Sequence, residues 1–423
     1  MTNSFPVSDF GQIKRKVLSW LHRFDTFCFL DNHQYAIEPH TQECLVAAGV
    51  RRKISANAGT ALLQLQAMID DKRSWLFGHL GYDLKNELEQ PANSRSDRIL
   101  FPDLFFFEPE IVIRWNNNAM VIDASDPVAV FDEILTASAS NIADHQTPVI
   151  SNRLKETEYI DTIKQLRQHI LRGDCYEINF CQEFYAEDAE IDPFVVYDRL
   201  ASVSPNPFSA LYRIDDKWLI CASPERFLMK KGRRILSQPI KGTLKRERGN
   251  PEDDEKNREL LLTSSKDRSE NVMIVDLVRN DLSRICEEGS VRVDELYGIY
   301  TFPQVHQMIS TISGNVEKDI SFTDIIRATF PMGSMTGAPK TRVIELIDKY
   351  EKTKRGIFSG ALGYISPEGD FDFNVVIRSL MYNATQAYLS FQAGSGITFY
   401  SDPQKEWEEC LLKAEAIKQV LSV

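Results

Sequence analysis

Amphipathic helical stretches alternate with short apolar runs along this chain. Residues 9–24 place apolar side chains three or four positions apart behind Asp9, which predicts a capped helix. Residues 26–30 and 35–38 are short runs typical of strands, and residues 75–84 predict an aromatic strand with two glycines. A mixed α/β fold is therefore expected from the start of the chain.

Three more apolar runs follow at residues 104–107, 111–115 and 119–123. The first two are joined at Glu108-Pro109 and the last two at residues 116–118, and both connections are rich in turn-forming residues. We therefore predict two antiparallel hairpins here, which would form half of a β-sandwich.

Residues 137–148 are small, polar and without periodicity, which is typical of a linker. We place a boundary there, between an N-terminal region at residues 1–145 and a second region at residues 146–423. The predicted fold class is α/β, with an antiparallel β-sandwich and helices packed outside it.

The second region begins with an amphipathic helix at residues 156–171, ended by Gly173, and a strand at residues 175–184. Glu177 and two other polar side chains share one face of that strand, which predicts either a lined cavity or a solvated face. Later helices and strands alternate up to a terminal helix at residues 403–421.

Lys241 stands at the end of one of these strands. Residues 234–238 predict a strand that stops at Pro239, because proline cannot donate to a ladder, and Gly242 lets the backbone pass close to a ligand. A lysine fixed at a strand end is one interpretation, and an ordinary surface lysine in a turn is the other.

Composition excludes several classes of function. The chain has 423 residues, 43% of them hydrophobic, and a net charge of −12, which argues against a nucleic-acid partner. Seven scattered cysteines without a C-x-x-C pair indicate neither zinc nor disulfides, and they favour a cytoplasmic location. We expect no export signal and no membrane span. An anionic substrate would then need a positive pocket or a bound cation.

Acidic side chains recur at helical spacing in two places, as Asp267 with Glu270 and as Glu406 with Glu409. Glu406 and the later Lys413 border an apolar stripe, where a charge is costly unless it is paired or metal-bound. Oxygen ligands without a histidine or cysteine cluster suit Mg²⁺. Solvated helix faces are the alternative.

Two other stretches favour an anionic ligand. Residues 331–340 form a Gly/Ser/Thr loop that enters a helix with Pro339 as its first residue, and helix N-termini bind anions. Arg378 interrupts an apolar strand predicted at residues 374–380, and with Tyr364 it could hold a substrate carboxylate. A plain helix start and a structural salt bridge are the competing accounts.

Together these stretches resemble the chorismate-utilising enzyme family. From about residue 150 to the end, the chain carries motifs in the family's order: Ser223-Pro-Glu225, Pro239-Ile-Lys-Gly-Thr243, residues 270–281, Gly333-Ser-Met-Thr-Gly-Ala-Pro-Lys340, Gly363-Tyr364, Ile377-Arg378, Ala393-Gly-Ser-Gly396, and Ser401-Asp402 followed by Glu406, Glu409 and Lys413. The front third is similar mainly through His79-Leu-Gly-Tyr-Asp83.

Lysine within the motif around Lys241 resembles the family branch that leads to 4-aminobenzoate, whereas anthranilate-forming members typically have alanine there. The resemblance implies that chorismate and ammonia give 4-amino-4-deoxychorismate. Lys241 would attack ring carbon C2 as the 4-hydroxyl leaves, with Glu225 as general acid, and ammonia would then displace the lysine by entering at C4. A neutral amine is needed, so we expect a lowered pKa for Lys241 and a raised pKa for Glu225.

The same resemblance implies the ligands of the site. Mg²⁺ would bind the ring carboxylate of chorismate through Glu270 and Glu409, with Glu406 and Asp267 nearby. The remaining implied residues contact the enolpyruvyl carboxylate or line the pocket: Tyr364, Arg378, Gly394, Ser395, Gly396, Lys413, Thr243, His306 and Thr336.

Glu177 departs from the family pattern, in which glutamine is common and water-activating members have lysine. An anion there disfavours attack by water, and the role of Glu177 stays open. Since no glutaminase segment is visible, we expect ammonia from a separate glutamine amidotransferase subunit, and we expect no fused lyase. An anthranilate synthase component I and a non-catalytic chorismate or tryptophan sensor are the alternatives.

Overall fold

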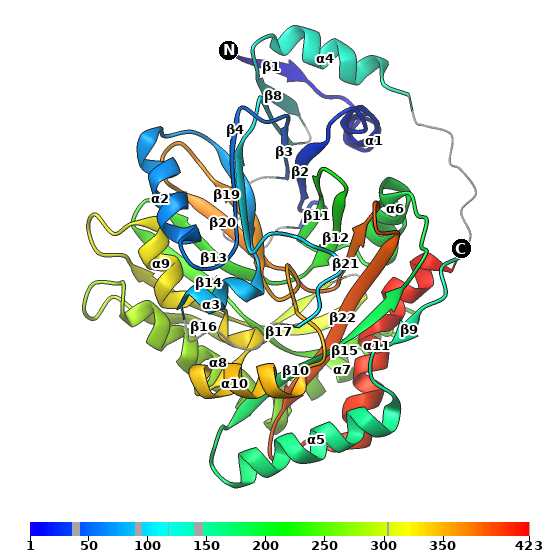
Figure 1. Ribbon diagram of the computed structural model, residues 1–423, viewed down its shortest axis with the longest axis vertical. Helices are drawn as coiled ribbons and strands as arrows, with labels where there is room; N and C mark the ends of the chain where they lie inside the picture. Colours follow the sequence, from blue (N-terminus) through cyan, green and yellow to red (C-terminus); the bar gives the residue numbers. More distant parts are fainter. Residues whose placement is uncertain (36–42, 89–94, 117, 139–146, 303, 423) are drawn as a thin grey trace.

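The computed structural model describes residues 1–35, 43–88, 95–116, 118–138, 147–302 and 304–422. Apolar runs of the sequence form two large sheets in this part of the chain, and their strands pair antiparallel (Figure 1).

The larger sheet has twelve strands. In spatial order they are β1 (Thr2–Pro6), β8 (Ala119–Asp123), β7 (Ile111–Trp115), β3 (Cys44–Ala48), β2 (Thr26–Asp31), β11 (Phe208–Ile214), β12 (Lys217–Ser223), β21 (Ser379–Asn383), β22 (Tyr388–Ile397), β10 (Glu177–Ala186) and β18 (Gly337–Ala338), with β9 (Ser151–Asn152) beside β10.

The smaller sheet has ten strands. Their order is β15 (Ile240–Lys245), β17 (Val305–Asn315), β14 (Arg234–Gln238), β13 (Arg226–Lys231), β20 (Phe371–Val375), β19 (Ala361–Ile365), β5 (Leu76–Leu80), β6 (Leu104–Glu108) and β4 (Arg52–Ala56), with β16 (Arg292–Thr301) beside β17.

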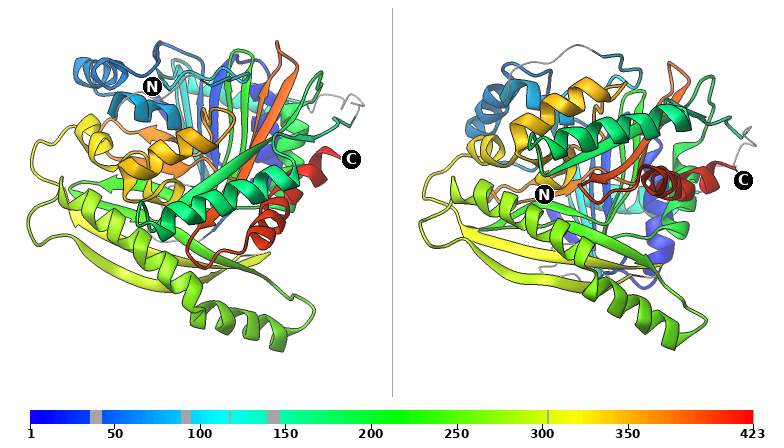
Figure 2. Two further views of the ribbon diagram at one scale, coloured as in Figure 1. Left: turned by 60° about the horizontal axis from the view of Figure 1, so that its bottom comes forward. Right: turned by 90° about the horizontal axis from the view of Figure 1, so that it is seen from below.

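Helices lie outside the sheets, and α5 and α11 run next to each other (Figure 2). The helices are α1 (Phe10–Leu21), α2 (Ala61–Asp71), α3 (Lys85–Leu88), α4 (Pro127–Thr136), α5 (Glu156–Leu171), α6 (Pro193–Val203), α7 (Pro251–Thr263), α8 (Ser265–Ser283), α9 (Phe322–Thr329), α10 (Lys340–Tyr350) and α11 (Pro403–Leu421), with 3₁₀ turns at Tyr82–Leu84 and Gly333–Met335.

Two apolar clusters hold these layers together. One lies between the sheets and includes Phe77 and Phe105 of the smaller sheet with Tyr212 and Leu219 of the larger. The other lies between the larger sheet and helices such as α5 and α11. Because both faces of the larger sheet are covered, most residues of its central strands are buried. The predicted α/β sandwich with outer helices is confirmed.

Both sheets contain strands from either side of residue 145. β2 pairs with β11 in the larger sheet, and β5 pairs with β19 in the smaller sheet. The division at residue 145 stays a prediction about the sequence, and most of its linker, residues 139–146, lies outside the described residues.

Several predicted elements are confirmed, including α1, α5 and α11, and the hairpin of β7 with β8. The predicted hairpin at Glu108-Pro109 is wrong. β6 pairs with β4 and β5 in one sheet, whereas β7 pairs with β3 and β8 in the other. Turn-forming residues allow the chain to reverse, but burial of both strands in different layers makes it cross between sheets.

Two assignments near the site also need correction. Pro339 is the N-cap of α10 and not its first residue. Residues 374–380 do not form one strand, because β20 ends at Val375 in one sheet and β21 begins at Ser379 in the other. Arg378 lies in the crossing with a φ of 49°.

The strand predicted at residues 35–38 lies almost entirely outside the described residues. No described helix is both long and apolar enough to cross a bilayer.

Candidate active site

Lys241 lies where the edges of the two sheets meet. It is on β15, the edge strand of the smaller sheet, within a bulge between Ile240 and Thr243. Gly242 has a φ of 88°, and a Cβ there would lie 2.9 Å from Leu261 and 3.0 Å from Asp267. Only glycine fits this bend without strain, and the bend leaves the Lys241 side chain 10% exposed.

The Lys241 ammonium donates a hydrogen bond to Glu177 Oε1 on β10 of the larger sheet. Burial alone would lower the pKa of Lys241, but the carboxylates of Glu177, Glu270 and Glu225 raise it above its usual value. The predicted lowering of this pKa is therefore wrong for the protein by itself. The sequence indicated burial of the amine, but it did not reveal how many carboxylates would face it.

Glu225 lies in the turn between β12 and β13 and is 4% exposed. Burial raises its pKa to about 7, although a hydrogen bond with Ser334 and the charge of Lys241 act in the opposite direction. The predicted raised pKa is confirmed. Glu225 can therefore hold a proton near neutral pH, as a general acid must.

Arg378 is close enough to Glu225 for their charges to interact. Burial lowers the pKa of Arg378, and the carboxylate of Glu225 opposes that shift. Arg378 adopts a left-handed backbone within the crossing between β20 and β21, and its charge reaches Glu225 in the β12–β13 turn.

Buried carboxylates reach the site from two helices. Glu270 of α8 and Glu406 of α11 are 8% and 2% exposed, and the Lys266 ammonium lies 3.9 Å from Glu270 Oε1 and 3.8 Å from Glu406 Oε1. Burial raises the pKa of Glu270 to about 7. Its Oε1 is buried and has no hydrogen-bond partner among the described residues.

The other two predicted metal ligands have partners of their own. Glu409 lies 2.7 Å from Lys413, which lowers the pKa of Glu409 although burial opposes that shift. Asp267 accepts a hydrogen bond from the Ser264 hydroxyl at the start of α8. Over the residues that the structure describes, no three Asp, Glu, His or Cys side chains form a metal-binding group. The four predicted ligands therefore do not form a ready ligand set, although the charges of all four act on the Lys266 ammonium and raise its pKa against the effect of burial.

Glu270 and Glu406 nevertheless fit a magnesium ion. Mg²⁺ usually keeps several waters and takes one or two carboxylates together with substrate oxygens. Two buried carboxylates converge on one ammonium here, and one of their oxygens lacks a hydrogen bond. A cation already occupies this position in the form of the Lys266 side chain.

The glycine-rich end of strand β22 lies directly against the lysine. A Cβ at Gly396 would lie 2.6 Å from Glu177 Oε1 and 3.0 Å from Lys241 Nζ, so glycine is needed for these two groups to meet. The Ser395 hydroxyl donates to Glu406. A Cβ at Gly394 would lie 1.9 Å from a backbone oxygen of β10, so this glycine serves strand packing, and its carbonyl accepts from Lys413 at 3.0 Å.

Tyr364 does not join this group. It lies on β19 opposite Phe77 and Asp372, and it lines a separate pocket that also contains Asp31 and Arg226. Within the smaller sheet, Tyr364 pairs with Asp372. Arg378 lies six residues further along the chain, where the chain has left this sheet for the other. The structure therefore does not place the two side chains around one carboxylate.

The three remaining predictions differ in placement. His306 is held by Asp254 and Thr301, each at 3.0 Å. The Thr336 hydroxyl donates to the carbonyl of Met332 at 3.1 Å within its own loop. Thr243 is exposed on β15. Each of these polar groups has a role or a position that the linear motif did not reveal.

Gln307 was missed. It lies opposite Thr243 on β17 and is fully buried, and neither atom of its amide has a hydrogen-bond partner among the described residues. The Nδ2 atom of Asn271, on α8 beside Glu270, is also unpartnered. Buried polar groups normally find partners, so these amides indicate a place for a polar ligand. The sequence of this strand, in which apolar and polar residues are mixed at positions 305–312, does not distinguish Gln307 from its polar neighbours.

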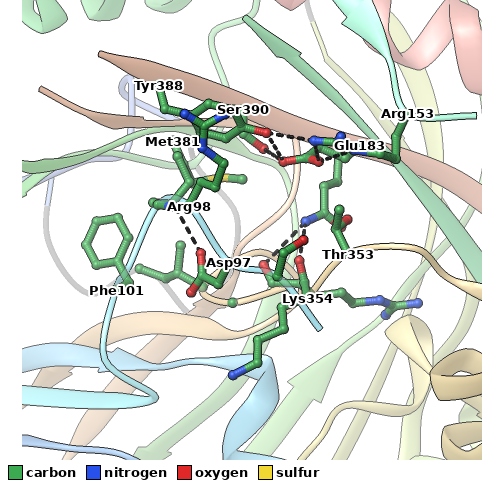
Figure 3. A pocket seen from close by; sticks show the side chains of 16 residues that line it. Asp97, Arg98, Phe101, Arg153, Glu183, Thr353, Lys354, Met381, Tyr388 and Ser390 are labelled. Atoms are coloured by element: carbon green, nitrogen blue, oxygen red, sulfur yellow. Dashed lines mark hydrogen bonds and ion pairs between the residues drawn. The ribbon is translucent and has the colours of Figure 1, made fainter. Parts of the chain in front are cut away.

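A second pocket, shown in Figure 3, contains none of the predicted site residues. Glu183, one of the two acids that line it, accepts two hydrogen bonds from Arg153, at 2.9 and 2.7 Å. The hydroxyls of Tyr388 and Ser390 donate to the other carboxylate oxygen. Because these polar groups satisfy one another, we assign Glu183 a structural role.

Comparison with known sequences gives consistent relatives. The sequence profile of chorismate binding enzymes matches residues 26–419. Aminodeoxychorismate synthase component 1 of Salmonella typhimurium is 35% identical over 351 residues, which cover 80% of this chain and 75% of that protein. The anthranilate synthase component I-like protein of Synechocystis is 32% identical over 354 residues, with coverages of 82% and 72%.

Solved structures share the two-sheet architecture. Anthranilate synthase component I from Streptococcus pneumoniae superimposes with a TM-score of 0.78 at 25% identity, covering 91% of this chain and 94% of that chain. The menaquinone-specific isochorismate synthase of Escherichia coli has a TM-score of 0.78 at 16% identity, with coverages of 100% and 94%. The second likeness concerns the fold alone.

Proposed function

Because this chain belongs to the chorismate binding enzyme family, we propose that it converts chorismate and ammonia into 4-amino-4-deoxychorismate. The observation that carries this proposal is the placement of Lys241, an amine 10% exposed that faces Glu177 and lies within the electrostatic reach of Glu225. Several relatives named aminodeoxychorismate synthase component 1 support it, at 33% to 36% identity over most of the chain.

Lys241 acts as the nucleophile in this proposal. Once deprotonated, its nitrogen forms a bond to ring carbon C2, the ring double bond shifts, and the C4–O bond breaks. Glu225 gives its proton to the departing oxygen, so that water leaves instead of hydroxide. Ammonia then attacks C4, the double bond shifts back, and the bond from C2 to Lys241 breaks.

Substrate carboxylates are held from two sides. Arg378, with a pKa lowered by burial, provides a positive charge beside Glu225. Glu270 and Glu406 would hold Mg²⁺, which would supply the positive charge that fixes the other carboxylate of chorismate. Because all of these groups are at least partly buried, their charges act through a medium of lower dielectric than water.

Ammonia is proposed to come from a separate glutamine amidotransferase subunit. A glutaminase nucleophile is an accessible, reactive cysteine, whereas all seven cysteines of this chain are buried. Burial raises the pKa of Cys181 to about 12, and of Cys221, Cys286 and Cys410 to about 11. Free ammonium should therefore support the reaction of this chain, and glutamine should not.

Product analysis tests the proposal. The protein is incubated with chorismate, Mg²⁺ and ammonium, and the product is identified by mass. We expect 4-amino-4-deoxychorismate, and we expect Lys241→Ala to abolish its formation. Fluorescent anthranilate would favour the synthesis suggested by the Synechocystis and Streptococcus relatives, and a wild-type rate in Lys241→Ala would remove this lysine from the mechanism.

A further inference from the structure

Glu177 is the acidic group closest to the proposed nucleophile. Its Oε1 accepts a hydrogen bond from Lys241 Nζ, and its Oε2 is buried without a partner among the described residues. The whole side chain is 1% exposed. No other cation pairs with Glu177 in the described part of the chain, so this carboxylate is dedicated to the lysine.

The surrounding chain is shaped to keep the pair together. Glu177 lies next to the register position where β10 pairs with β22, and Gly396 of β22 leaves the space in which the two groups meet. Lys241 reaches the same space from the bulge in β15. The two sheets, and the missing side chain at Gly396, therefore bring Lys241 and Glu177 into one hydrogen bond.

We propose that Glu177 is the catalytic base of this site, taking a proton from the Lys241 ammonium before attack and returning it when the lysine is released. This inference rests on the proposed function. In the forward step a Lys241 N–H bond breaks, an O–H bond forms on Glu177, and the nitrogen keeps the electron pair that attacks the ring. In the return step the released amine takes the same proton back.

Substrate binding favours the transfer. Burial disfavours both members of an ion pair, so removing water from the pocket stabilises the neutral amine and neutral carboxylic acid relative to the charged pair. The charged groups that face Lys241 come from four parts of the chain: Glu177 on β10, Glu225 in the β12–β13 turn, Glu270 on α8 and Glu409 on α11. Among these four carboxylates, all within the described part of the chain, only Glu177 accepts a hydrogen bond from the amine.

A pair of measurements on Glu177→Gln tests the base. The first is competitive acetylation of lysines with acetic anhydride across pH, read by peptide mass, with the exposed Lys256 as internal reference. Loss of the carboxylate should move the Lys241 midpoint at least one pH unit lower and leave Lys256 unchanged. The second is the rate of product formation from chorismate and ammonium at pH 7.

If Glu177 is the base, Glu177→Gln should increase the fraction of deprotonated Lys241 but lower the reaction rate at least tenfold, because general bases contribute roughly 10²–10⁴-fold. Glu177→Asp, which keeps the carboxylate, should recover part of the rate. A partner that only neutralises charge predicts more free amine and an equal or faster rate, which would overturn the proposal. An unchanged acetylation midpoint would also overturn it, because the ion pair would then be absent in solution.

These outcomes are separate from failure of the proposed function. If wild-type protein makes no 4-amino-4-deoxychorismate, the function fails whatever the variants do. If wild-type protein makes it through Lys241 but Glu177→Gln is as fast, only the assignment of Glu177 fails. Circular dichroism of both variants checks that the fold is kept, and Glu177→Asp carries the rate test if the glutamine variant does not fold.

Discussion

Glu225 shows how one buried side chain can link the reaction to pH. Its carboxyl has a pKa of about 7 because it is buried, so near neutral pH about half of the molecules carry the proton that the leaving hydroxyl needs. Neighbouring cations reduce this effect without reversing it. The acid is thus prepared before substrate arrives.

We therefore expect kcat/KM to fall as pH rises through about 7, where Glu225 loses its proton. Glu225→Gln should lower the rate roughly 10²–10⁴-fold and leave the residual rate flat over this pH range. Product formation from ammonium between pH 6 and 9 is the measurement, with ammonia rather than total ammonium held constant. A falling limb that persists in the variant would assign it to another group.

Glu270 gives a prediction about stability. Burial raises the pKa of Glu270 to about 7 in the folded protein, whereas the unfolded pKa is about 4.3. As pH rises between these two values, the unfolded state loses this proton first, so the folded protein becomes progressively less stable. Glu270→Gln should therefore have the same melting temperature as wild type near pH 4.5 and a higher one above pH 7. Glu408→Gln, exposed on the partner helix α11, is the control and should change neither value.

At the scale of elements, the site depends on how closely β10, β22 and β15 approach. Gly396 is where this approach is tightest, since a methyl group there would overlap Glu177 and crowd Lys241. The contact concerns side-chain atoms and not the strand ladder, so it affects the site more than the sheet.

Gly396→Ala should accordingly lower the rate with ammonium at least tenfold, because displacing catalytic groups by about 1 Å costs about 10²-fold. The melting temperature should change by only a few degrees. Gly249→Ala is the matched control, since a Cβ at Gly249 meets nothing within 4 Å. Equal rates for the two variants would show that Glu177 and Lys241 do not meet as described.

Helices α8 and α11 bring Lys266 between two carboxylates. Its side chain is 48% exposed and can therefore leave for solvent when a divalent cation takes its place. An ammonium tethered at the metal position competes with the metal, and this competition should weaken binding of Mg²⁺.

Lys266→Met should therefore bind Mg²⁺ several-fold more tightly, as measured by calorimetry on the protein without substrate. Lys256→Met removes a lysine that is 66% exposed and pairs with Asp253 of its own helix, α7, and the Mg²⁺ affinity of this variant should equal that of wild type. Weaker binding in Lys266→Met would mean that this lysine supports the metal site instead of competing for it.

At the scale of the whole molecule, neither side of residue 145 builds a complete sheet. The pairings of β2 with β11 and of β5 with β19 join the two sides inside both layers. A fragment would expose these strand edges together with the apolar faces between the sheets.

We expect residues 1–145 and residues 146–423, expressed separately, to be aggregated or unfolded. Co-expression should restore a soluble complex with activity, because the missing connection lies in the predicted linker. Circular dichroism and size-exclusion chromatography are the measurements. A cooperative thermal transition of residues 1–145 alone would instead show an independently folding unit.

The sequence by itself determined the elements and the chemistry that they carry. Periodicity gave the bounds of α5 and α11, and proline and glycine placed the end of β14 and the bend at Gly242. These signals are local, because capping, backbone freedom and side-chain period depend on a few neighbouring residues. Motif order similarly indicated Lys241, Glu225 and Glu270 before any contact was known.

Only the tertiary structure decided which of these residues meet. Sheet membership separated Tyr364 from Arg378, and it made the chain cross between layers at Glu108-Pro109. It also placed Glu177 against Lys241, which turned an expected neutral amine into an ammonium with a raised pKa. A pKa depends on every charge within several ångströms, and those charges come here from residues up to 168 positions apart, Lys241 to Glu409. No local pattern contains that information.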